Sequence, residues 1–197
     1  AQILRTAAER LVAHGHPSGL DGYQSESPQR AYMLTAAIYS AIAAMGLHYA
    51  EPPASFESRG QKIRRPSTIA EERLATCLDI TLLFAAAIEA TGLHPIILMF
   101  DGHAAAGVWL AKRTFSNAIE TDHMEVRKAL VSRELIVLEL TGVTHRPVLT
   151  FDSAQSALNH RLAEDQAKAF VAAIDVRRSR SGGITPLASH EPIRRNS

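Results

Sequence analysis

The sequence predicts an α+β fold, in which a buried helix carrying the only cysteine packs on an antiparallel sheet. Three observations support this prediction. Apolar residues recur at helical spacing towards both ends of the chain. A nearly unbroken apolar run, CLDITLLFAAAIEA, begins at Cys77. Two β-rich runs flank the turn dipeptide Asp101-Gly102. Helices that are segregated from antiparallel strands define the α+β class.

The bulk composition indicates one soluble globular domain. The chain has 197 residues, of which 46% are hydrophobic and 21% charged, which suits a single core. We expect residues 1–180 to form that domain and residues 181–197 to be a polar tail or linker. A net charge of +1 provides no surface field that would attract nucleic acid or anionic lipid. One cysteine cannot form an internal disulfide, which is consistent with a reducing, cytoplasmic compartment.

No segment is long and apolar enough to predict a membrane span. The best candidate, ITLLFAAAIEATGL, is shorter than the roughly 20 residues required and contains Glu89. The opening residues mix charges with apolar positions and do not resemble a secretion signal. The chain has no initiator methionine and ends in the polar SHEPIRRNS, so we expect a piece excised from a longer polypeptide.

The first third of the chain predicts two helices and an irregular connection. Residues 2–13 are amphipathic, and Ser27-Pro28 is a favourable cap and first turn for a helix that runs to Met45 before Gly46. The proline-containing and basic segment 48–68 is expected to cross the surface without regular structure.

The position of Cys77 relative to a helix start can be interpreted in two ways. Thr76 and Asp79 match a capping box, which would make Cys77 the first residue of a helix ending at Thr91. There, free backbone N–H groups and the positive end of the helix dipole favour a thiolate. Alternatively, Thr68 and Glu71 form the box and one helix spans 69–91. We favour the break before Cys77 and interpret Asp79 as a cap.

The second half of the chain predicts three strands and two helices. The predicted strands are 94–100, 103–110 and 134–144, of which the first two form a hairpin. We expect a short helix near 122–130 and a long one over about 154–178, which the basic RRSRSGG closes.

His103 and Glu139 are the candidates to act with Cys77. His103 begins a strand at the mouth of a turn, and Glu139 interrupts the apolar strand VLELT. A carboxylate in such a strand is costly unless paired, and a histidine on the neighbouring strand would pair with it. A Cys–His–acid set is a nucleophile, a base and its orienting group. Each residue also has a structural interpretation: an inert buried thiol, a locally bonded turn histidine, and a partner for Arg146.

Other polar clusters are interpreted structurally. His14 and His16 lack a third ligand, so we expect no metal site. The basic run 177–180 suits a solvated helix end and lacks the interleaved aromatic residues of a nucleic-acid site. Trp109, on the strand of His103, is interpreted as a core or pocket-wall aromatic and is the candidate substrate contact.

The sequence blocks CLD, GHAAAGVWL and LELT resemble the Cys, His and acid blocks of transglutaminase-like domains in the papain-like cysteine peptidase superfamily. Those domains usually have Asp at the third position, where this chain has Glu139. Segments over most of residues 20–187 are similar to a bacterial version of the domain, which occurs in large multidomain proteins with helicase-type ATPase and nuclease-like regions.

The resemblance implies a papain-like core and a specific chemistry. It implies acyl transfer from an amide of a protein or peptide, without a cofactor, with Cys77 as nucleophile. It further implies an oxyanion site formed by the Cys77 N–H and the Gln61 amide, although Gln61 also suits a loop-bracing role. Water as acceptor gives a peptidase or amidase, and an amine gives a transglutaminase. The alternatives are a catalytically silent binding module within a helicase-type or defence-type protein and a purely structural domain.

Overall fold

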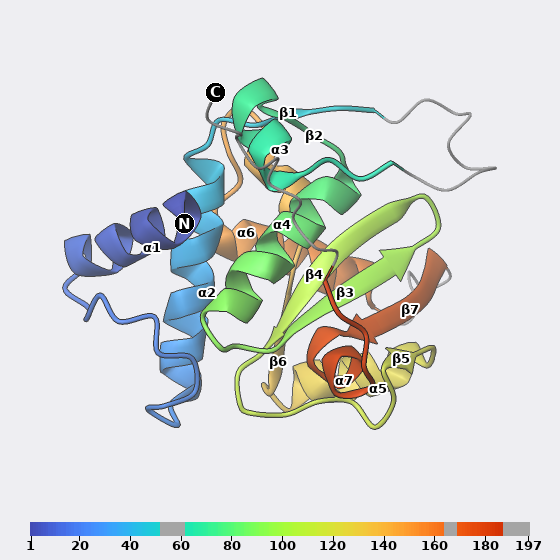
Figure 1. Ribbon diagram of the computed structural model, residues 1–197. Coiled ribbons are helices and arrows are strands. Elements are labelled where there is room, and N and C mark those ends of the chain that lie inside the picture. The colour runs from blue at the N-terminus through green and yellow to red at the C-terminus, as the bar shows by residue number, and fades with distance from the viewer. Residues whose placement is uncertain (52–61, 164–168, 187–197) are drawn as a thin grey trace, which may run out of the picture.

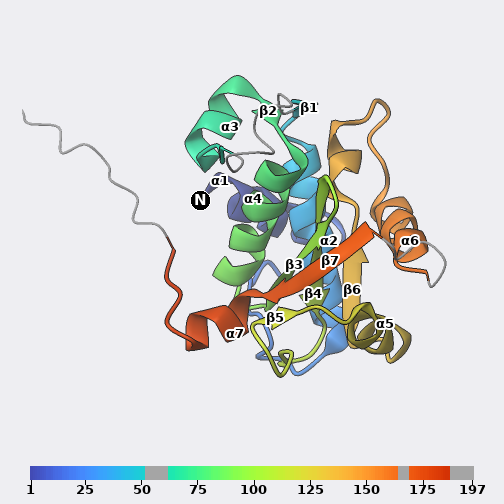
Figure 2. The ribbon, with the colours of Figure 1, turned by 90° about the vertical axis from the view of Figure 1, so that its right-hand side faces the viewer.

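A computed structural model describes residues 1–51, 62–163 and 169–186, and the described part has α+β architecture. A five-stranded antiparallel sheet of order β5-β7-β3-β4-β6 lies between helices on both faces (Figures 1 and 2). The strands of this sheet are β3 Pro95–Phe100, β4 His103–Trp109, β5 Ile119–Glu120, β6 Leu135–Leu138 and β7 Phe170–Asp175. A separate parallel pair consists of β1 His48–Tyr49 and β2 Leu74–Ala75. The helices are α1 Gln2–Ala13, α2 Pro28–Ala43, α3 Pro66–Glu72, α4 Cys77–Ala90, α5 His123–Val131, the short 3-10 helix η2 Leu140–Thr144, α6 Phe151–Arg161 and α7 Val176–Ser181.

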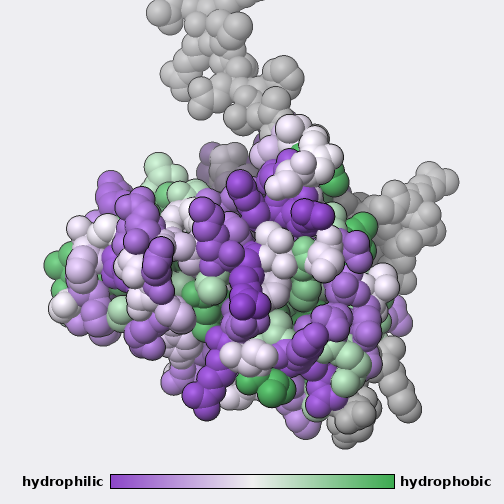
Figure 3. Space-filling view, turned by 90° about the horizontal axis from the view of Figure 1, so that it is seen from below, coloured by the Kyte–Doolittle hydropathy of each residue, from purple (hydrophilic) through white to green (hydrophobic). Residues whose placement is uncertain are grey.

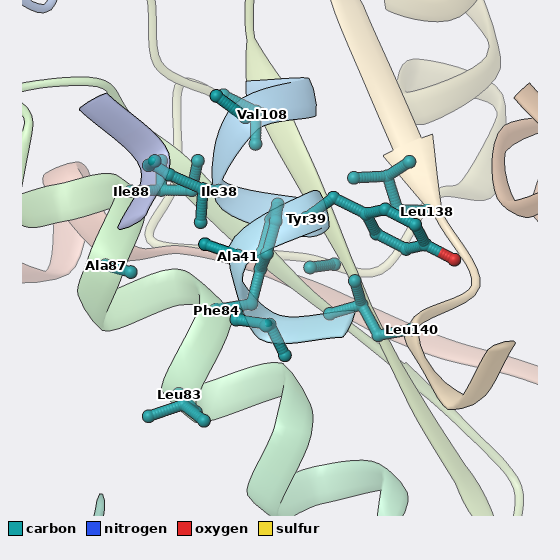
Figure 4. Close-up of a cluster of buried hydrophobic side chains, with 14 of the residues drawn as sticks. Ile38, Tyr39, Ala41, Leu83, Phe84, Ala87, Ile88, Val108, Leu138 and Leu140 are labelled. Carbon is teal, nitrogen blue, oxygen red and sulfur yellow. The ribbon is translucent and has the colours of Figure 1, made fainter. Parts of the chain in front are cut away.

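The sheet separates two hydrophobic cores because successive strand residues face opposite sides. Ala106 and Val108 of β4 pack with α1, α2 and α4. Figure 4 shows this core, where Phe84 and Ile88 of α4 lie against residues of α2 and of the sheet. Ala105 of β4 faces the second core, which contains residues of α5 and α6. The cysteine-bearing helix is therefore buried between the sheet and α2, as the sequence predicted.

The predicted break before Cys77 is confirmed. Helix α3 ends at Glu72, and Arg73 has a left-handed φ of 54°, which stops the helix. Strand β2 follows, and α4 begins at Cys77 after the N-cap Thr76. The single-helix interpretation over 69–91 is wrong, because Thr76 and Asp79 form the capping box that starts a new helix.

The predicted β3–β4 hairpin is also confirmed. Phe100 pairs with His103 across the Asp101-Gly102 turn, where Gly102 has a positive φ of 66°. Helices α1, α2 and α5 lie where the sequence placed them, and α2 ends two residues before Met45. His103 is therefore the first residue of its strand, as expected.

The long helix expected over 154–178 is wrong. Helix α6 ends at Arg161, and residues 170–175 form β7, which lies between β3 and β5 in the sheet. Its backbone pairs with both neighbours, and its Asp175 caps the short helix α7. Tertiary pairing thus overrides the helical spacing of this segment.

Two further boundaries differ from expectation. The strand expected over 134–144 ends at Leu138, and η2 follows, so Glu139 lies just beyond the strand rather than inside it. The connection 48–68 contains β1 at its start and the first turn of α3 at its end, and its residues 52–61 lie outside the described part.

The lower end of the molecule, opposite the start of α4, is mainly hydrophilic, with hydrophobic residues in small separate groups (Figure 3). Within the described ranges, no helix combines the length and apolarity that crossing a membrane requires.

Candidate active site

Three distant segments meet at one end of the sheet. The start of α4 and the β3–β4 turn lie at the same end of the molecule (Figure 1), and β6 pairs with β4 so that Leu138 faces Ala106. This register brings Glu139, one residue after β6, to the start of β4. His103 Nε2 lies 2.8 Å from Glu139 Oε2, and the two side chains are 15% and 16% exposed. The structure therefore brings these two predicted residues together.

Glu139 is held rigidly by its own neighbours. It is the N-cap of η2, and its Oε1 accepts hydrogen bonds from Thr141 N (3.1 Å) and Thr141 Oγ1 (2.7 Å). Its other oxygen, Oε2, is thereby directed to His103. The partner considered from the sequence, Arg146, instead donates to backbone carbonyls, including that of Leu47.

Cys77 is close to His103 and is only 5% exposed. The His103 side chain, the Ala104 backbone and the Tyr49 side chain lie close enough to the thiol to act on its pKa. Because Nε2 of His103 is occupied by Glu139, Nδ1 is the ring nitrogen available to exchange a proton with the sulfur. The buried sulfur therefore has polar neighbours, and Cys77, His103 and Glu139 form one row.

The electrostatics of the row favour a charged pair. Burial raises the pKa of the Cys77 thiol, but hydrogen bonding with His103 and Ala104 and the His103 charge lower it below its ordinary value. Burial lowers the pKa of His103, but hydrogen bonds with Cys77 and Glu139 outweigh this and raise it to about 9. Burial raises the pKa of Glu139, whereas its bond to His103 brings the net value below normal. At neutral pH these directions favour thiolate, imidazolium and carboxylate.

Tyr49 is a neighbour of the thiol that sequence reasoning missed. Strand β1 pairs with β2 so that Tyr49 faces Ala75, two residues before Cys77. Burial raises the pKa of the Tyr49 hydroxyl, and the nearby Cys77 raises it further. Tyr49 lies in a segment that has no strand pattern, so no local signal could have indicated this contact.

Asp79 does more than cap α4. Its Oδ2 accepts from Thr76 N at 3.0 Å and from Arg64 Nη1 at 2.9 Å, and its Oδ1 accepts from Arg64 N at 2.8 Å. Its side chain is fully buried. Asp79 therefore fixes the segment before α3 to the start of the cysteine helix.

One predicted site residue, Trp109, is not brought to this row. Trp109 lies at the opposite end of β4 from His103, is 4% exposed, and donates its Nε1–H to Asp175 at 3.1 Å. It packs on Phe115 in the second core, so its placement does not support the expected substrate contact. Gln61 lies outside the described residues.

No group of three or more His, Cys, Asp or Glu side chains suited to a metal ion occurs in the described part of the chain. Comparison of the chain with protein-family models, with curated proteins and with solved structures gave no match.

Proposed function

We propose that this domain catalyses acyl transfer from an amide bond, with Cys77 as nucleophile, His103 as proton carrier and Glu139 as the group that orients His103. The single observation that carries the proposal is the 2.8 Å bond between His103 and Glu139 at the start of the helix that presents Cys77. A nucleophile, a base and an orienting carboxylate in hydrogen-bond sequence are the groups that covalent amide chemistry needs.

The proton moves between His103 and the reacting groups in two steps. In the first, Cys77 Sγ forms a bond to the amide carbon, and the amide nitrogen takes the proton of His103 as its bond to that carbon breaks. The products are a thioester on Cys77 and a free amine. In the second, water or an amine attacks the thioester and loses a proton to His103, and the carbon–sulfur bond breaks. Glu139 stays ionised throughout.

The start of α4 supplies stabilisation for the oxyanion of each tetrahedral intermediate. Cys77 is the first residue of the helix, where backbone N–H groups have no intrahelical acceptor and the helix dipole is positive. We assign the Cys77 N–H as one oxyanion donor, and Gln61, on the sequence resemblance alone, as the other.

We also propose that the domain has a papain-like or transglutaminase-like core. A cysteine at the start of a buried helix, packed on an antiparallel sheet with histidine and acid on adjacent strand ends, is the arrangement that a papain-like or transglutaminase-like core requires. We therefore keep a protein or peptide as the proposed acyl donor. The expectation of a bacterial multidomain parent protein rests on the sequence resemblance alone.

A second candidate function is a binding module without turnover. The 5% exposure of Cys77 favours it, because a substrate carbonyl must approach the sulfur. In that case, the same row of residues would hold a bound peptide end without forming a thioester.

The proposal is tested with p-nitrophenyl acetate, followed by pools of unmodified peptides. We expect one acetyl group per wild-type chain by intact-protein mass spectrometry, attached at Cys77 and released faster when an alkylamine is added. Because amides need a protonated leaving group, His103→Gln should still be acetylated by the activated ester, more slowly since it has less thiolate, but should lose reaction with peptides.

Cys77→Ala is the control for labelling elsewhere in the chain. Acetylation of the variant to the wild-type extent would contradict the assignment of Cys77. Peptide binding by the wild-type protein, without any acyl adduct or cleavage product, would favour the binding module instead.

A further inference from the structure

The last residue of α6, Arg161, lies over the ring of Phe100, which is the strand partner of His103. Its Cζ lies 5.3 Å from the centroid of the Phe100 ring, and that centroid lies 6.3 Å from the centroid of the His103 ring. Phe100 and His103 face each other in the β3–β4 hairpin. The fold therefore brings a cation from α6 close to the proposed proton carrier.

No carboxylate neutralises Arg161 within the described ranges. Its Nη1 is buried without a hydrogen-bond partner, and its side chain forms no ion pair there. By contrast, the arginines Arg30, Arg64 and Arg180 each pair with an aspartate or glutamate. The face of the Phe100 ring offsets part of the cost of burying this charge. A partly buried cation that has no anionic partner among the described residues is expensive for a purely structural contact.

The positive charge of Arg161 acts on His103 within a set of other charged groups. The groups that face His103 are Cys77 from α4, Glu139 after β6 and Arg161 from α6, and Tyr49 from β1 acts through Cys77. With thiolate, imidazolium and carboxylate present, the row carries one net negative charge, and the positive charge of Arg161 acts on its imidazolium. Burial and the charge of Arg161 lower the pKa of His103, whereas Cys77 and Glu139 raise it.

We propose that Arg161 is a positioning residue of this site, whose positive charge keeps His103 able to release its proton to the leaving amine. The proposal deepens the acyl-transfer function and rests on it. Cys77 and Glu139 alone would hold the proton on His103 too tightly, and a weaker acid protonates an amide nitrogen more slowly. Arg161 acts against them through its charge and touches no reacting atom.

The test is the titration of His103 by NMR of histidine-labelled protein, with the resonance assigned by its loss in His103→Gln. Arg161→Gln should move the titration midpoint to higher pH than in the wild type. Arg161→Lys, which keeps the charge, should leave it close to the wild-type value. Arg10→Gln, which removes the same charge from the exposed face of α1, should also leave it unchanged.

Arg161→Met separates charge from packing, since it keeps an aliphatic chain on Phe100. We expect it to shift the midpoint as the Gln variant does. A midpoint for Arg161→Gln and Arg161→Met at or below the wild-type value would overturn the proposal, as would an equal upward shift for Arg161→Lys. The titration needs no substrate, so a midpoint shift in a protein that fails to form the acyl adduct would contradict the acyl-transfer function and not the electrostatic role of Arg161.

Discussion

Single residues decide which nitrogen of His103 can exchange a proton with Cys77, because an imidazole ring has only two nitrogens and each can bind one partner. Glu139 occupies Nε2, and Thr141 in turn fixes the other oxygen of Glu139. That leaves Nδ1 for the sulfur of Cys77. The carboxylate therefore sets both the orientation and the protonation of the ring.

Replacing Glu139 by glutamine should weaken the thiolate. Without the carboxylate, the pKa of His103 falls, and the pKa of the Cys77 thiol rises because its imidazolium partner is less populated. At a pH below the thiol pKa of both proteins, we expect alkylation by iodoacetamide to slow by about tenfold for each unit by which the thiol pKa rises. Glu134→Gln, which breaks a pair with Arg113 elsewhere, is the matched control. Equal rates for Glu139→Gln and wild type would count against the orienting role.

The grouping of Cys77, His103 and Glu139 could be predicted because each residue stands out locally: a lone thiol at a helix cap, a histidine at a turn, and a carboxylate after apolar residues. Tyr49 and Arg161 could not. Their relation to the site depends on the β1–β2 pairing and on where α6 ends, which are long-range contacts without a local pattern.

Among the elements, α4 depends on one buried carboxylate for its start. Asp79→Ala removes the capping box and leaves Arg64 and Thr76 N–H without this acceptor. We expect the free energy of unfolding to fall by about 2–3 kcal/mol, because buried donors lose their acceptor while the Arg64 side chain, 29% exposed, can still be hydrated. Asp122→Ala is the matched control, because Asp122 caps α5 at the surface and should cost about 1 kcal/mol.

Urea unfolding measures both variants. A loss for Asp79→Ala no larger than that for Asp122→Ala would show that the Arg64 contact contributes little. It would also show that the stability contribution of Asp79 comes from capping α4 and not from its contact with the segment before α3.

Strand β7 shows why element type could not always be predicted. Its sequence, FVAAID, is short, and its alanines fit a helix as well as a strand. Its strand conformation comes from pairing with β3 and β5 on both edges, and those partners lie more than 50 residues earlier in the chain. Helix α4, in contrast, has its cap, its apolar run and its end within one continuous segment, so its bounds were predicted closely.

At the scale of the whole molecule, Asp175 joins the end of β4, the segment that follows it and the start of α7. Its fully buried side chain accepts from Trp109 Nε1, from Phe115 N at 2.9 Å and from Arg178 N at 2.8 Å. Asp175→Ala should destabilise the protein by roughly 3 kcal/mol or more, because it leaves several donors without this acceptor. Trp109→Phe should cost less and should leave the alkylation rate of Cys77 unchanged. Slower alkylation of Cys77 in Trp109→Phe would support the original interpretation of Trp109 as a contact of the candidate site.

The stability of the whole chain should also depend on pH through His103. Its folded pKa, about 9, lies above the ordinary 6.5, so the folded state binds the proton more tightly. This contribution is complete below pH 6.5 and is lost as pH rises through the folded value. We compare Cys77→Ala with Cys77→Ala/His103→Gln, in which no thiol titrates and Glu139 still raises the pKa of His103.

The difference in unfolding free energy between these two proteins should be larger at pH 6 than at pH 9, by about 1 kcal/mol for each unit of remaining pKa shift. Urea titrations at the two pH values measure it. A difference that is constant or grows with pH would mean that His103 is not held as an imidazolium.

The central claim is that folding makes Cys77 a thiolate through His103. It is tested most directly by the rate of iodoacetamide labelling of Cys77 as a function of pH, in wild-type protein and in His103→Gln. We expect the wild type to reach its full labelling rate well below pH 8. The variant should have a midpoint at or above the ordinary thiol value of about 8.5, because burial raises the pKa of a thiol that has lost its imidazolium partner. Identical profiles with an ordinary midpoint in both proteins, or no labelling of the native wild type, would contradict the claim.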